Sequence, residues 1–182
     1  VTGIVHHVEF SPDGSTFVVQ HRIEKPWFTS FYDAVGGILR TSVMTGWING
    51  MAWDPQDRWI AFAAREGDVT LYDRKQDTIR LLGRHRNGAR TAMFNIAGDL
   101  LFTGGGEQEI ICWDLHLWQP VLTVRHRSTQ LQFRADGEEC ALITRNALQL
   151  CTLERPAACR ELAVDLGGSL QHAAISPDGR WL

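Results

Sequence analysis

The sequence has little of what marks several large classes of protein. Lysine is scarce: of the eighteen basic residues only Lys25 and Lys75 are lysine, and the others are arginine. The net charge of −3 provides no overall attraction for nucleic acid. No apolar run approaches the roughly 20 residues that a membrane-spanning helix requires. These absences argue against a basic nucleic-acid binder and against a helical membrane protein.

Metal-binding and catalytic patterns are also missing. The histidines His6 and His7 are neighbours, and on a strand neighbouring side chains point to opposite faces, so the two cannot bind one ion. The four cysteines lie in apolar contexts without metal-ligand spacing, at Cys112, Cys140, Cys151 and Cys159. We expect no metal, no cofactor and no catalytic residues.

Two of the cysteines have a possible cross-strand relationship. A tight turn between Cys140 and Cys151 would place them opposite each other. A disulfide is then conceivable in an oxidising compartment. We favour two small core thiols in a reducing cytoplasm, which is the location we expect for the protein.

Helical periodicity is absent, and short alternating segments take its place. Runs rich in Val, Ile, Leu, Phe and Trp are separated by Gly, Pro, Asp or Asn. This pattern predicts many short antiparallel strands and an all-β fold. In the clearest stretch we expect strands at 89–94, 100–103, 109–114 and 120–124.

A unit of about forty residues repeats along the chain. Its first landmark is an apolar anchor, with successive spacings of 43, 41, 39 and 42 residues, at Phe10, Trp53, Phe94, Phe133 and Ile175. A second landmark follows the first four anchors, at Tyr32-Asp33, Tyr72-Asp73, Trp113-Asp114 and Cys151-Thr152.

These landmarks resemble the WD-repeat β-propeller family, in a degenerate form similar to the repeats of bacterial multidomain proteins. Trp113-Asp114 is the signature dipeptide, and His85 stands nine residues before Phe94 at the family's usual spacing. The fourth unit departs from the pattern at Cys151-Thr152. The resemblance implies blades of four antiparallel strands.

The repeat length also bounds the number of blades. We expect four complete blades at about 3–43, 47–82, 89–124 and 128–164, followed by a partial fifth at 170–182. Propellers protect the apolar faces of their blades by closing radially. We therefore expect a single partial propeller, with the remaining blades supplied by the same or another chain.

One group of polar residues matches the structural hydrogen-bond tetrad of the family: His85, Thr103, Glu107 and Trp113. Glu107 stands where the family usually has Asp. A His, a hydroxyl and a carboxylate could suggest a catalytic triad. The resemblance implies instead that the Thr103 hydroxyl is buried within the network.

Arginines gather around His85, at Arg80, Arg84, Arg86 and Arg90, and again at Arg125 and Arg127. In a propeller these connections between blades emerge on one face. The candidate partner-binding face comprises Trp47, Asn49, Arg65, Arg84, Arg86, Arg90, Arg127 and Gln171. Guanidinium groups suit carboxylate or phosphate.

The resemblance implies a non-enzymatic scaffold for protein–protein interaction, as part of a larger multidomain protein. Its expected partners carry acidic or phosphorylated segments, and no membrane is involved. Two alternatives remain open. One is a propeller enzyme with its site at the channel mouth or in further blades. The other is a binder of anionic ligands or nucleic acid through the basic face.

Overall fold

The computed structural model describes residues 3–22, 26–35, 37–43, 46–106, 109–125, 128–133, 139–144, 148–152 and 158–162. These residues form sixteen strands in four sheets, which we call blades 1 to 4, and they contain no helix. Every pairing between neighbouring strands is antiparallel. The predicted all-β fold of four-stranded antiparallel blades is therefore confirmed.

In each blade the strands lie in chain order. Blade 1 contains β1 (Ile4–Phe10), β2 (Thr16–Arg22), β3 (Phe28–Asp33) and β4 (Ile38–Val43). Blade 2 contains β5 (Ile48–Trp53), β6 (Trp59–Ala64), β7 (Asp68–Asp73) and β8 (Thr78–Arg84). Blade 3 contains β9 (Ala89–Phe94), β10 (Leu100–Gly105), β11 (Glu109–Asp114) and β12 (Gln119–Arg125). Blade 4 contains β13 (Ser128–Phe133), β14 (Glu139–Thr144), β15 (Leu148–Thr152) and β16 (Ala158–Leu162).

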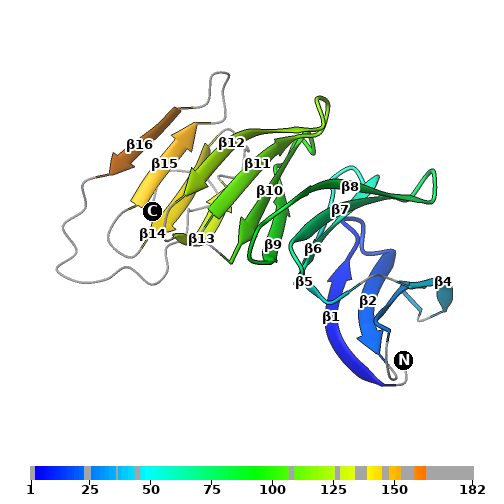
Figure 1. Ribbon diagram of the computed structural model, residues 1–182. Helices are drawn as coiled ribbons and strands as arrows, with labels where there is room; N and C mark the ends of the chain where they lie inside the picture. The colour runs from blue at the N-terminus through cyan, green and yellow to red at the C-terminus, as the bar shows by residue number, and fades with distance from the viewer. Residues whose placement is uncertain are drawn as a thin grey trace.

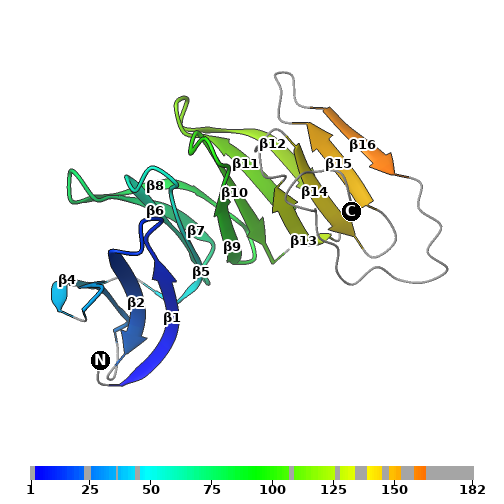
Figure 2. The same cartoon turned by 180° about the vertical axis from the view of Figure 1, so that it is seen from behind.

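The blades follow one another in a curved row (Figures 1 and 2). The first strands of neighbouring blades lie together, with β1 next to β5 and β5 next to β9. This arrangement is consistent with part of a propeller, and the described residues form no closed sheet. The expected fifth blade at 170–182 lies outside the described residues.

The acidic residue of the second landmark closes the turn between the third and fourth strands. The Oδ1 atom of Asp73 accepts hydrogen bonds from the backbone N–H groups of Lys75 and Gln76, at 2.8 and 2.9 Å. Asp33 and Asp114 accept equivalent bonds in blades 1 and 3. The landmark therefore recurs because each of these turns needs a local acceptor for its backbone donors.

The apolar core lies between blades. Between blades 1 and 2, Val18 and Phe31 belong to one buried cluster with Met51, Trp53 and Ile60 of blade 2. A second cluster joins blade 2 to blade 3, and includes Ala61, Leu71, Leu101 and Trp113. Each large side chain that is fully buried in this way stabilises the fold by roughly 1.5–3 kcal/mol.

One glycine permits an especially close contact between blades 2 and 3. A Cβ atom at Gly83 would lie 2.2 Å from the Cη2 atom of Trp113. Because Gly83 has no side chain, the indole of blade 3 can lie directly against β8. The Trp of the second landmark therefore depends on a glycine in the preceding blade.

Cysteines contribute to the contact between blades 3 and 4. Phe102 and Cys112 of blade 3 form a buried cluster with Cys140 of blade 4. Both cysteines are free thiols. Burial raises the pKa of each to about 12. Cys140 does lie opposite Cys151 in the strand register, as the sequence predicted.

Candidate interaction site

Three connections meet at one end of blades 2 and 3, which we call the site end. The N–H of Arg65, after β6, donates to the carbonyl of Trp47 at 2.6 Å. The N–H of His85, after β8, donates to the carbonyl of Gly67 at 2.9 Å. These backbone bonds hold the β6–β7 turn between the connections that enter β5 and β9.

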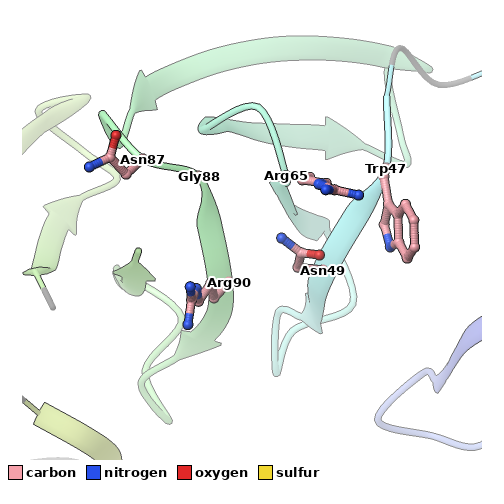
Figure 3. A pocket seen from close by; sticks show the side chains of 6 residues that line it. All are labelled: Trp47, Asn49, Arg65, Asn87, Gly88 and Arg90. Carbon is pink, nitrogen blue, oxygen red and sulfur yellow. The ribbon is translucent and has the colours of Figure 1, made fainter. Parts of the chain in front are cut away.

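A cavity of about 510 Å³ opens at the site end, and its lining residues are Trp47, Asn49, Arg65, Asn87, Gly88 and Arg90. Figure 3 shows that the first three come from blade 2, whereas Asn87, Gly88 and Arg90 come from the start of blade 3. The two blades therefore build the cavity together. Trp47, Asn49, Arg65 and Arg90 are four of the residues that the sequence assigned to a common face.

The indole of Trp47 is held in place by aromatic and cationic neighbours. Its Nε1–H donates to the Nε2 atom of His6 at 2.9 Å. The ring of Trp27 lies 5.1 Å from that of Trp47, and the Arg65 guanidinium lies over the Trp47 ring at 5.1 Å. A positioned indole of this kind offers contact area with little loss of side-chain entropy on binding.

The cavity carries uncompensated positive charge. Arg65 and Arg90 are both exposed, and neither forms an ion pair within the described part of the chain. The amide of Asn49 donates to the carbonyl of Ala89 at 2.8 Å and so ties blade 2 to blade 3 beside them. A ligand that enters here meets two guanidinium groups and one indole.

The other arginines of the predicted face are placed differently. Arg84 forms an ion pair with Asp68, its Nε atom lying 2.5 Å from Oδ1. Arg86 is exposed in the connection after β8 but does not line the cavity. Arg127 and Gln171 lie outside the described residues.

The grouping of Arg80 with the cluster around His85 was wrong. Its guanidinium lies 4.4 Å from the ring of Trp118, in the turn between β11 and β12. Arg80 is near the start of β8 and Arg84 is at its end. Because a strand advances about 3.3 Å per residue, the two side chains lie at opposite ends of the blade.

Three members of the predicted tetrad are linked by hydrogen bonds through the Thr103 hydroxyl. The Nε2 atom of His85 lies 2.8 Å from the Oγ1 atom of Thr103, and Trp113 Nε1–H donates to the same oxygen at 2.8 Å. His85 and Thr103 are each 1% exposed. The hydroxyl is therefore shielded from solvent and engaged by two partners, which suits a structural role better than that of a nucleophile.

The carboxylate near this network was not identified from the sequence. Glu107 lies outside the described residues, whereas Glu109, the first residue of β11, places Oε2 3.3 Å from Nδ1 of His85. The two atoms are close enough for an ion pair, but their geometry is not that of a hydrogen bond. Burial lowers the pKa of His85, and Glu109 opposes that effect only in part. The folded chain therefore favours the neutral imidazole over the charged form.

No group of three or more His, Cys, Asp or Glu within the described residues could hold a metal ion. The same residues include no helix long and apolar enough to cross a membrane.

Comparison with known proteins identifies a local similarity. No family model matches the chain. Over 57 residues the chain is 37% identical to nuclear distribution protein PAC1-1 of Uncinocarpus reesii, a WD-repeat-type protein. The matched segment is 31% of this chain and 13% of the relative. The chain therefore matches only a small part of that relative's length.

Proposed function

We propose that this chain is a segment of a WD-repeat-type propeller and acts as a non-enzymatic scaffold for protein–protein interaction. Three observations support the proposal. The landmarks repeat in register, the described residues form four-stranded antiparallel blades, and a segment is similar to a WD-repeat-type protein.

The cavity at the site end is the proposed docking site. The observation that carries this proposal is that two arginines without an ion pair among the described residues, Arg65 and Arg90, lie beside the positioned indole of Trp47. Arginine and tryptophan are both enriched among interface hot spots. The partner supplies a carboxylate or phosphorylated side chain to the guanidinium groups and an apolar side chain to the indole.

A further blade is the second proposed partner. In blade 1, Val8 and Phe10 are exposed on the face that points away from blade 2. The corresponding residues of blade 2, Met51 and Trp53, are buried against blade 1. The same surface in blade 1 therefore suits another four-stranded blade, from this polypeptide or from another.

A peptide-binding measurement tests the docking site. Fluorescent peptides with glutamate or phosphoserine beside leucine are titrated with the protein, and affinity is read from fluorescence anisotropy at two salt concentrations. We expect binding that weakens as salt rises, because charged contacts are screened. The double variant Arg65→Glu/Arg90→Glu should lose at least about tenfold in affinity, since each guanidinium contact is charge-assisted.

Arg86→Glu is the matched control. It reverses one exposed charge in the β8–β9 connection, at the same end of the blades, and Arg86 itself does not line the cavity. Equal losses in the control and in the double variant would indicate general electrostatic attraction and contradict a defined site. Trp47→Ala should weaken binding of the leucine-containing peptides more than that of peptides with glycine in place of leucine.

A further inference from the structure

A second cavity, of about 360 Å³, lies between blades 2 and 3 at the end opposite to the site end. The β5–β6, β7–β8, β9–β10 and β11–β12 connections surround it. Its aromatic wall consists of Trp59 and Trp118, whose rings meet edge to face at 5.5 Å and 78°. Arg80 covers the Trp118 ring at 4.4 Å, and Arg58 covers the Trp59 ring at 4.7 Å.

Trp118 occupies an unfavourable backbone position. Its φ angle is 54°, in the left-handed region, which a bulky side chain rarely adopts. The corresponding turn of blade 2 places Asp77 there with a φ of 59°. Aspartate tolerates this conformation better than tryptophan does. The contacts of Trp118 with Trp59 and Arg80 must therefore offset its backbone strain.

The repeat itself does not require this aromatic wall. Between blades 1 and 2, the position of Trp59 is occupied by Thr16 and that of Trp118 by Asp77. A contact needed by every pair of blades would recur at both places. The two indoles are thus absent from the interface of blades 1 and 2. An arginine does recur, since Arg40 pairs with Phe31 in blade 1 as Arg80 pairs with Leu71 in blade 2. A cavity remains open beside Trp59, Trp118 and Arg80, so these side chains do not simply fill the space between the two blades.

Among the described residues, the charged side chains that line this cavity have hydrogen-bond or ion-pair partners, with the exception of Arg80. Arg58 lies 3.4 Å from the carboxylate of Asp73. The oxygens of Asp54 accept the N–H groups of Gln56 and Arg58, and Asp99 accepts the amide of Asn95 at 2.7 Å. Arg80 has no carboxylate partner among the described residues. Its guanidinium remains able to accept an anionic ligand.

We propose that the cavity between Trp118, Trp59 and Arg80 binds a carboxylate side chain of a peptide, together with the apolar side chain next to it. The Arg80 fork matches a carboxylate, and the indole beside it provides an apolar surface. Asp54 and Asp99 also line the cavity, so a doubly charged phosphate is repelled more strongly than a single carboxylate. This site goes beyond the scaffold proposal and does not depend on the site end.

Fluorine NMR of protein labelled with 5-fluorotryptophan tests the proposal. The Trp118 signal is assigned from the spectrum of Trp118→Phe. The probes are two capped ten-residue peptides of glycine and serine, one containing Leu-Glu-Leu and the other Leu-Gln-Leu. We expect the glutamate peptide to shift the Trp118 signal in a saturable way. The glutamine peptide should bind at least about tenfold more weakly, because it lacks the charge-assisted contact.

Variants separate this site from other positive charges. Arg80→Gln should abolish the preference for glutamate. Lys75→Gln removes an exposed cation from the β7–β8 turn without altering the cavity lining, and it should leave the preference intact. Arg90→Gln should also leave it intact, whatever its effect at the site end. Equal binding of the two peptides, equal effects of Arg80→Gln and Lys75→Gln, or a larger Trp118 response to inorganic phosphate than to the glutamate peptide would overturn the proposal.

Discussion

Blades 1 and 2 present the same type of apolar face, but only one of the two faces is covered. In blade 2, Met51 and Trp53 are 5% and 8% exposed because blade 1 packs on them. In blade 1, the corresponding Val8 and Phe10 are 44% and 60% exposed. We call this uncovered surface, made by Val8, Phe10 and Phe17, the open face of blade 1.

The difference shows that the anchor residue specifies a contact between blades. Phe10 packs against Phe17 of its own blade, with ring centroids 5.4 Å apart, yet most of its surface remains exposed. Trp53 reaches the preceding blade, where its Nε1–H donates to the carbonyl of Glu9 at 3.3 Å. An apolar anchor at this position therefore contributes its full stabilisation only when a second blade covers it.

The largest expected effect comes from truncating the covered anchor. Trp53→Ala should lower the free energy of unfolding by about 3–5 kcal/mol, because it leaves a large cavity. Phe10→Ala should cost less than about 1 kcal/mol, because most of the ring is already exposed to solvent. Urea denaturation of both variants measures the contrast. A loss at Phe10 as large as that at Trp53 would show that another blade covers the open face in solution.

The second prediction concerns the close contact between blades 2 and 3. Gly83→Ala should cost about 1–3 kcal/mol, because the new methyl group overlaps the indole of Trp113. The smaller ring of Trp113→Phe should recover part of this loss when the two changes are combined. Denaturation of the two single variants and the double variant provides the coupling energy. Strict additivity would contradict the contact.

The third prediction addresses the buried network of blade 3. His85→Ala should cost about 1–3 kcal/mol, because Thr103 loses a hydrogen-bond partner in a buried place. Relative to the original protein, the variant should lose more protection from hydrogen exchange in blade 3 than in blade 1. A variant as stable as the original protein would mean that water replaces the imidazole without cost.

The smallest effect is a dependence on pH. Burial lowers the pKa of His85 and of His21 below the ordinary value of 6.5. Between that value and the lower folded values, the unfolded chain binds more protons than the folded chain. The free energy of unfolding should therefore fall as pH decreases from about 7 to 5. His85→Gln should reduce this slope in denaturant titrations, and an unchanged slope would assign the effect to other groups.

Much of the fold was accessible from the sequence because its landmarks are local. Asp73 and Asp114 are recognisable as turn residues, since their acceptor role depends on backbone groups two or three positions away. The strands of blade 3 could be placed to within about two residues, because alternation and turns delimit them. For example, the strand expected at 100–103 extends to Gly105.

Contacts between blades were harder to anticipate. The spacing of the repeat indicated that Trp47, Arg65 and Arg90 belong to one end. It could not show that Glu109 approaches His85, because two carboxylates lie within three positions and strand register decides between them. Arg80 was assigned to the wrong end because it is only four residues from Arg84 in the sequence, although the two residues lie near opposite ends of β8. Its partner Trp118 is 38 residues away and takes a backbone conformation that its residue type does not favour.

The thiols of Cys112 and Cys140 allow separation of blades 3 and 4 to be followed by chemical labelling. With a pKa of about 12, only on the order of one thiol in ten thousand is ionised at pH 8, and the thiolate is the reactive form. Both groups are also closed off from reagents by the packed blades. Alkylation must therefore wait until the two blades separate. The rate of labelling at Cys112 and Cys140 in the native protein, measured separately from that at Cys151 and Cys159 by peptide mapping, thus reports how often the contact between blades 3 and 4 opens.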